Sequence, residues 1–205
     1  MPKASATNAL LTESLYATVG GARLHVRRMR TGDGGAPVLM VHGAIENGRI
    51  FYSASGKGLG PFLAARGYDV YVGDLRGRGG SEPHIARGHD YGQTAAIVED
   101  IPAMAALVAQ ASDHKPQHWI AHSWGGVLLA SHLVRFPART PAVKSLTCFG
   151  TKRTISVRNL DKLIGIDLVW NRLGPLSGLI AGFFPAERLG IGADDETRRS
   201  LSDWL

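Results

Sequence analysis

The sequence predicts an α/β fold: a doubly wound, mostly parallel sheet with helices on both faces. Two observations predict it. Between residues 37 and 149, short apolar runs alternate with helical patterns in the order strand, helix, strand, helix, strand, helix, strand. Upstream, Gly20-Gly21 separates two strand-like runs, which indicates an antiparallel hairpin at one edge of the sheet. We therefore expect a core over residues 1–150 and a helical cap over residues 151–205, where no further buried strand is visible.

Each element has a local signature. The short continuous apolar runs are typical of strands that are buried on both faces of a parallel sheet. Two of the helical patterns end at Gly67 and Pro137, residue types that stop helices. A third contains Pro102, which should kink it. The expected strands are 14–19, 22–30, 37–41, 68–73, 117–121 and 143–149, and the expected helices are 58–66, 94–110, 126–136, 159–171, 176–184 and 194–205.

Composition excludes several classes of protein. A chain of 205 residues that is 44% hydrophobic can bury a core as one domain. The net charge is +6, but no nucleic-acid-binding module accompanies the scattered Lys and Arg residues, so we expect no nucleic-acid partner. Without a signal-peptide core or a run of ~18 apolar residues, we expect a cytoplasmic chain and no stable membrane insertion. The only cysteine, Cys148, excludes an internal disulfide and lies in an apolar run, where we expect it to be buried and inert.

One stretch, residues 119–127, has the pattern of a strand that runs into a tight turn and then a helix, with Ser123 on the turn. Such an elbow lifts a serine clear of both elements, in a strained backbone conformation, if the residues two before and two after it are small. Those residues are Ala121 and Gly125, so the chain departs from the pattern G-x-S-x-G by one methyl group. Ser123 is therefore a predicted nucleophile, and the alternative is a chance small-x-Ser-x-Gly at a helix start.

Other glycine-rich turns do not predict a cofactor. The turn at 74–81 lacks the third glycine and the following helix of a dinucleotide-binding loop, and the run at 56–58 lacks the Ser or Thr of a P-loop. The strand expected over 37–41 ends in His42-Gly43-Ala44, which leaves backbone N–H groups free at the carboxyl edge of the sheet. Ligands bind at that edge in open α/β sheets.

Three motifs in register resemble the α/β-hydrolase family: His42-Gly43-Ala44 after the third strand, the turn 74–81 after the fourth, and Ala121-His122-Ser123-Trp124-Gly125 after the fifth. The resemblance covers about residues 15–150, and residues 151–205 match the family's helical cap. Among its members the chain is most similar to esterases and lipases of the monoacylglycerol-lipase or lysophospholipase type.

The resemblance implies that Ser123 attacks an acyl carbonyl and forms an acyl-enzyme. The backbone N–H groups of Ala44 and Trp124 would hold the oxyanion. His42 and Gly43, with Ala121 and Gly125, would shape the loop and the elbow. Asp74 would cap its own turn, and His122 would pack with its side chain directed away from Ser123. The expected ligand is a small ester or lipid-like substrate, with no metal and no cofactor.

The family's acid and histidine are missing from the expected order of Ser, then Asp or Glu, then His. Downstream of Ser123 only His132 remains, about 13 Å along the same helix at ~1.5 Å per residue. The family's last two strands are also absent. We therefore expect an incomplete enzyme: either a truncated gene product or one piece of a split or processed protein, which would have a complementary C-terminal fragment as its partner. Recruitment of the upstream His84 or His89 as base is the less favoured alternative.

Two other functions remain open. The chain could be a non-catalytic ligand-binding protein on a hydrolase scaffold, or an acyltransferase that uses the same serine. The apolar stretch 177–184 is expected either to form a lid over an apolar site or to be an ordinary core helix. It favours acyl or aromatic esters over sugars and nucleotides.

Overall fold

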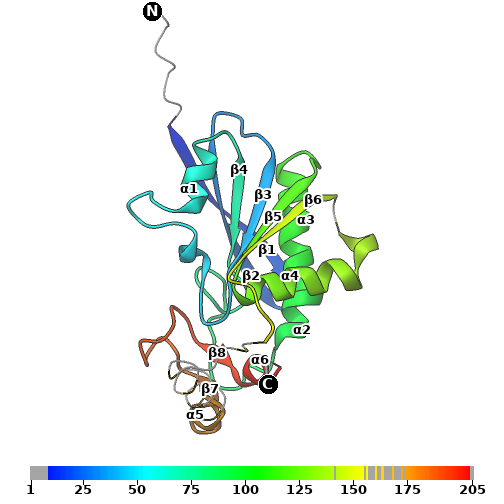
Figure 1. Ribbon diagram of the computed structural model, residues 1–205. Helices are drawn as coiled ribbons and strands as arrows, with labels where there is room; N and C mark the ends of the chain where they lie inside the picture. Colours follow the sequence, from blue (N-terminus) through cyan, green and yellow to red (C-terminus); the bar gives the residue numbers. More distant parts are fainter. Residues whose placement is uncertain are drawn as a thin grey trace, which may run out of the picture.

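The computed structural model describes residues 9–140, 142–154, 156, 160, 163, 168, 172 and 174–203. Its centre is a six-stranded sheet with the order β1-β2-β4-β3-β5-β6 (Figure 1). β1 and β2 form the predicted hairpin, β2 also pairs antiparallel with β4, and the remaining pairs are parallel. The fold class is therefore confirmed. The strands are β1 (Leu10–Val19), β2 (Ala22–Thr31), β3 (Pro37–Val41), β4 (Asp69–Gly73), β5 (Gln117–His122) and β6 (Val143–Phe149).

Helices cover both faces of the sheet, as the alternating pattern predicts. α1 (Leu59–Ala64) packs on one face, and α3 (Ile101–Ala111) and α4 (Trp124–Arg135) pack on the other (Figure 1). β3 shows why its run is continuously apolar. Leu39 and Val41 belong to the core under α3 and α4, whereas Val38 and Met40 belong to the core under α1. Successive side chains of a strand point to opposite faces, so a central strand needs apolar residues at every position.

The helix expected over 94–110 is irregular where the proline predicts it. α2 (Gln93–Ala95) leads into a π-helical segment (Ala96–Asp100), and α3 follows with Pro102 in its first turn. Proline has no N–H and crowds the preceding turn, so a wider turn accommodates it. Among the described residues, this 19-residue run, Gln93–Ala111, is the one helix that length and composition would allow to cross a membrane. Its packing against the sheet is that of a core helix.

β6 corrects two expectations. It lies at the edge of the sheet, its side chains are mostly exposed, and Cys148 is exposed rather than buried. The expectation came from the apolar residues of the strand, but Lys144, Ser145 and Thr147 interrupt them, unlike the continuous apolar run of β3. Within the described part of the chain β6 pairs with β5 alone, as an edge strand does.

The segment 151–205 also differs from the expected set of helices. It contains α5 (Gly174–Ala181) and α6 (Arg198–Ser202), but residues 183–184 and 196–197 are not helical and pair as β7 (Phe183–Phe184) and β8 (Glu196–Thr197). Most of the helix expected over 159–171 lies outside the described residues. The stretch 177–184 was expected to be buried or to cover a site, yet Leu179 and Ile180 of α5 are exposed. Phe184 is its main buried side chain, in a small cluster of its own.

Candidate active site

Ser123 occupies the sharp turn between β5 and α4. Its backbone has φ +50° and ψ −124°, a conformation that L-residues with a side chain rarely adopt. Two hydrogen bonds hold the turn. The Ser123 N–H donates to the Phe149 carbonyl at 2.8 Å, and the Thr151 hydroxyl donates to the Ser123 carbonyl at 2.8 Å. Strained residues of this kind persist only where the surroundings hold them, and they gather at functional sites.

Small residues around Ser123 are required by close approaches of the backbone. A Cβ atom on Gly125 would lie 2.4 Å from the His42 carbonyl oxygen, and one on Gly43 would lie 2.8 Å from the Ser123 Cβ. Ala121 is fully buried, and its methyl group fits at the position where the G-x-S-x-G pattern has glycine. The structure thus brings together His42, Gly43, Ser123 and Gly125, which the sequence places in two distant segments.

His42 and Asp74 hold the two loops that flank this turn. His42 donates from Nδ1 to the Gly43 carbonyl at 2.8 Å and accepts at Nε2 from the Leu75 N–H at 3.1 Å. Burial, together with the nearby Arg78, lowers the pKa of His42, so the ring is neutral. Both nitrogens are used in loop contacts, which leaves this histidine no free nitrogen for a reaction.

Asp74 caps its own glycine-rich turn, as the sequence predicts. Its Oδ2 accepts from the Gly80 N–H at 3.0 Å and from His25 Nδ1 at 2.8 Å, while its Oδ1 accepts from the Gly48 N–H at 2.6 Å. Burial alone would raise the pKa of Asp74, but the His25 contact and the backbone N–H groups outweigh it, so the net pKa is lowered. The carboxylate is therefore ionised.

Glu46 organises the loop after β3, and the sequence reasoning missed it. Its Oε2 accepts from the Gly43 N–H at 2.8 Å and contacts His122 Nδ1 at 2.9 Å. His122 was expected to be packed, but it is about one-third exposed and paired with Glu46. The Ala44 N–H has no hydrogen-bond acceptor in the described part of the chain. The sequence signal that could have indicated Glu46 is an acidic residue three positions after Gly43, where its carboxylate can accept a hydrogen bond from a backbone N–H of the same loop.

The C-terminal residues secure the same loop from outside. Ile45 has φ +48°, which is costly for a β-branched residue, and its carbonyl accepts from the Ala193 N–H at 2.8 Å. Asp194 accepts from the Asn47 side chain at 2.7 Å and from the Gly79 N–H at 2.9 Å. Residues 193–194 therefore bind both loops at the carboxyl edge of the sheet.

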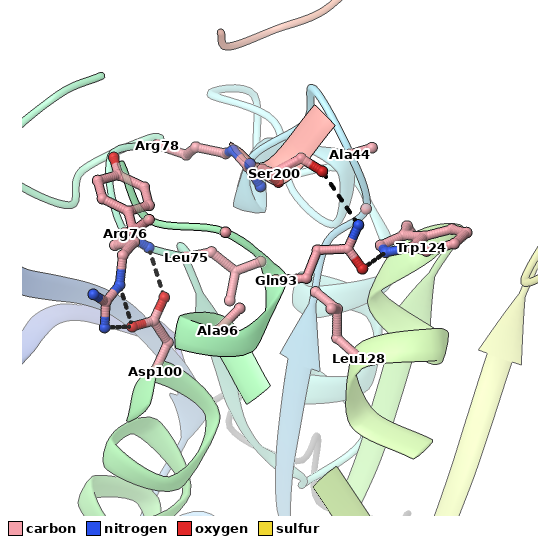
Figure 2. Close-up of a pocket in the computed structure, with 13 residues that line it drawn as sticks. Ala44, Leu75, Arg76, Arg78, Gln93, Ala96, Asp100, Trp124, Leu128 and Ser200 are labelled. Carbon is pink, nitrogen blue, oxygen red and sulfur yellow. Dashed lines mark hydrogen bonds and ion pairs between the residues drawn. The ribbon is translucent and has the colours of Figure 1, made fainter. Parts of the chain in front are cut away.

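A small cavity lies beside the predicted oxyanion residues Ala44 and Trp124 (Figure 2). Its accessible space is about 20 Å³, room for roughly one water molecule. Gln93 closes one side: its Oε1 accepts from the Trp124 indole N–H at 2.9 Å, and its Nε2 donates to the Ser200 carbonyl of α6 at 3.3 Å (Figure 2). Residues of the core and of α6 thus line this small cavity together.

The cavity wall carries charge as well as apolar surface. Arg76 binds the buried carboxylate of Asp100, with 2.6 Å between Nη2 and Oδ1, and Arg78 pairs with the buried Glu196. The Tyr91 hydroxyl is buried at the same wall, and burial raises its pKa to about 12. Leu75, Ala96 and Leu128 supply the apolar part of the wall.

None of the chain's eight histidines, all in the described part, forms a hydrogen bond to Ser123. Six are bound elsewhere. The contacts of His25, His42 and His122 are given above, His118 bonds to Ser145, and His132 bonds to the Ile97 carbonyl and to Thr140. His89 accepts from the Ala86 N–H, which ties the loop that contains it. The expectation that His132 does not reach Ser123 agrees with these contacts.

Comparison with known proteins identifies the family. Residues 36–177, more than half of the chain, match the model of the α/β-hydrolase fold family. This chain belongs to the α/β-hydrolase fold family. The resemblance that the three motifs predict is therefore confirmed.

Its relatives differ in activity. The chain is 31% identical over 142 residues to epoxide hydrolase A of Mycobacterium tuberculosis, an alignment that covers 66% of this chain and 38% of that protein. Among solved structures it is similar to Cfl2 of Burkholderia cenocepacia (TM-score 0.55, 19% identity, 82% of this chain and 54% of that one). It is also similar to a thioesterase domain of the curacin biosynthetic pathway (TM-score 0.51, 20% identity, 79% and 52%). The chain thus spans about two-fifths to half the length of these proteins, and the structural likenesses speak for the fold alone.

Proposed function

We propose that the protein is a serine-dependent acyl hydrolase, acting on a carboxylic ester or lipid-like ester through an acyl-enzyme on Ser123. One observation carries this proposal: the strained, positive-φ backbone of Ser123 between a buried strand and a helix N-terminus. This geometry presents a hydroxyl group at the carboxyl edge of the sheet, where ligands bind in such folds.

The chemistry follows from the neighbours of Ser123. Its Oγ attacks the ester carbonyl, its proton passes to a general base, and the C–O bond to the alcohol breaks to leave an acyl group on Ser123. The oxyanion forms beside the Ala44 N–H, which has no acceptor in the described part of the chain, and beside the first N–H of α4, on Trp124. Water then releases the acid.

The nucleophile separates this proposal from epoxide opening. A serine that attacks an epoxide carbon forms an ether, which water does not hydrolyse under these conditions, so a covalent cycle through Ser123 would stop after one turnover. A serine that attacks an ester carbonyl forms a new ester, which water does hydrolyse. Ser123 therefore supports acyl transfer, although the family relative with the highest identity quoted above is named for epoxides.

We place the general base and its acid partner outside these 205 residues. Two facts support this part of the proposal: no histidine forms a hydrogen bond to Ser123 in the described part of the chain, and the alignment covers 38% of epoxide hydrolase A. Residual reactivity from the oxyanion site alone would be small, because loss of a triad member leaves only part of the rate enhancement. A longer gene product that adds ~60–100 residues, a length judged from ordinary domain size, should be much more reactive.

The test is labelling with a fluorophosphonate, read by mass spectrometry of tryptic peptides. Ser123 lies in the peptide of residues 88–135. We expect fast labelling of this peptide in the longer gene product and its loss in Ser123→Ala. Absence of label at Ser123 in both forms would overturn the proposal and favour a ligand-binding protein. Product analysis with water and with an added alcohol separates hydrolysis from acyl transfer to an acceptor.

A further inference from the structure

A second serine, remote in sequence from Ser123, stands in a hydrogen-bonded chain with a histidine and an aspartate. Ser14 Oγ lies 3.0 Å from His25 Nε2, and His25 Nδ1 lies 2.8 Å from Asp74 Oδ2. Ser14 is on β1, His25 on β2 and Asp74 just after β4, so the sheet brings together residues that are 11 and 49 positions apart. The atoms involved are those of a serine nucleophile, its base and the group that orients the base.

The network assigns the proton positions. Asp74 accepts two backbone N–H groups besides His25, as an ionised carboxylate does. A carboxylate only accepts, so His25 must donate from Nδ1. In the neutral ring Nε2 is then the acceptor, and the Ser14 hydroxyl donates to it. This is the tautomer that a general base needs to take the serine proton.

Solvent exposure increases from Asp74 through His25 to Ser14, as a reaction at the Ser14 hydroxyl requires. The side chain of Asp74 is 3% exposed and that of His25 is 9% exposed, whereas Ser14 is exposed to solvent. The His25 backbone N–H also donates to Ser81 Oγ at 2.8 Å, which fixes the strand that carries the base. The base and the acid are thus held in the fold while the hydroxyl group remains accessible.

Positive charge lies directly across the strand pair. Arg27 is the register partner of Ser14, and side chains that are paired in this way share a face of the sheet. Its Nε is buried without a hydrogen-bond partner in the described part of the chain. The Arg27 guanidinium lies over the Tyr52 ring, 4.7 Å from its centroid, so the groups bonded to the Ser14 hydroxyl are His25 and, through it, Asp74.

From this geometry we propose that Ser14 is a second, independent nucleophile, activated by His25 and Asp74, that takes small activated acyl or phosphonyl groups from solvent. In the acyl reaction Ser14 Oγ bonds to the ester carbonyl carbon, and the Ser14 proton moves to His25 Nε2. The C–O bond to the leaving alcohol breaks, and the alcohol takes the proton back from His25. The product is an ester on Ser14. In the phosphonyl reaction fluoride leaves from phosphorus, and His25 retains the proton.

The chain supplies its own matched control. Ser145 Oγ lies 2.8 Å from His118 Nδ1, with Ser145 exposed and His118 partly buried, but no carboxylate is bonded to His118 in the described part of the chain. Ser145 is therefore a Ser–His pair without the aspartate. A structural hydrogen bond alone would leave Ser14 and Ser145 equally unreactive, so their ratio measures activation.

The experiment uses a small fluorophosphonate on the 205-residue chain with Ser123→Ala, followed by peptide mapping. Ser14 lies in tryptic residues 4–23 and Ser145 in residues 145–152, and fragmentation assigns the serine. We expect Ser14 to label at least about 100-fold faster than Ser145, in keeping with the rate factors of a positioned base. His25→Gln should reduce Ser14 to the rate of Ser145, and Ser14→Ala, an exposed change that should not disturb folding, should remove the label.

Equal rates at Ser14 and Ser145, or unchanged labelling in a folded His25→Gln protein, would overturn the proposal. If His25→Gln does not fold by circular dichroism, the ratio within the parent chain still decides. The result is independent of the acyl-hydrolase proposal, because label on residues 88–135 reports Ser123 and label on residues 4–23 reports Ser14.

Discussion

Substitution of Gly125 by alanine tests how tightly α4 packs against the end of β3 at the elbow. The added Cβ would lie 2.4 Å from the His42 carbonyl oxygen and 2.7 Å from that of Val41. Ordinary contact begins near 3.4 Å, so α4 and the end of β3 must separate by about 1 Å. Both obstructing atoms belong to backbone, which cannot rotate away. Overpacking of this kind lowers the free energy of unfolding by about 1–3 kcal/mol. Because the neighbouring atoms are rigid, we expect a loss of about 3 kcal/mol here.

The matched control is Gly126→Ala, the same change one residue along the same helix. Its Cβ would meet side-chain atoms in place of backbone: the Thr151 hydroxyl at 2.2 Å, Thr151 Cγ2 at 2.7 Å and Cys148 Sγ at 2.9 Å. The expected cost is about 1 kcal/mol, the hydrogen bond that Thr151 loses. Chemical denaturation with urea, followed by circular dichroism, measures both free energies of unfolding.

For a domain of this size about 3 kcal/mol corresponds to a fall in Tm of roughly 6–12 °C. Fluorophosphonate labelling of Ser123 in the longer gene product should fall with Gly125→Ala because the elbow is displaced. If Gly125→Ala costs no more than Gly126→Ala and labels at the parent rate, the close approach of α4 to β3 is not a constraint and the reasoning fails.

Three further predictions concern single groups. The folded pKa of Asp74 is lowered, so its carboxylate stabilises the folded protein fully above about pH 4, and this stabilisation is lost as pH falls through the folded pKa. Asp74→Asn should therefore make the urea midpoint less dependent on pH in acid. An unchanged pH dependence of the midpoint would contradict this. Cys148, exposed on the edge strand, should react with a thiol reagent in the native state, one thiol per chain, and a protected thiol would mean that β6 is covered in solution. Glu46→Ala releases the Gly43 N–H and should slow labelling of Ser123 on the order of tenfold, a change of about 1.4 kcal/mol in the barrier; an unaffected rate would show that Glu46 does not hold the loop.

Local pattern was sufficient for the central sheet and for the elbow. The run at β3 predicted its own bounds, because a strand buried on both faces must be apolar at every position and nothing distant is needed to see it. Ser123 was found in the same way, since a tight turn imposes small residues two positions to either side. Pro102 predicted the irregular helical turn because proline has no backbone N–H to donate.

The local sequence pattern does not show which elements pack against each other. Cys148 lies beside apolar residues of β6, yet it is exposed because β6 is the last strand of the sheet in the described chain. β7 and β8 are two residues each, too short to carry a periodic signal, and they exist only because they pair with each other.

The polar networks depend on the fold most of all. The hydrogen bond between Glu46 and His122 joins residues 76 positions apart in the sequence, and that between Asp74 and His25 joins residues 49 positions apart. Neither pairing can be predicted from the residues around each partner. Hydrogen bonds are short and directional, so they form only where the sheet register and the loops place two atoms within about 3 Å. Hydrophobic periodicity records which face of an element is buried, whereas the partner of a polar side chain is set by strand order and register, which arise only when the whole chain is folded.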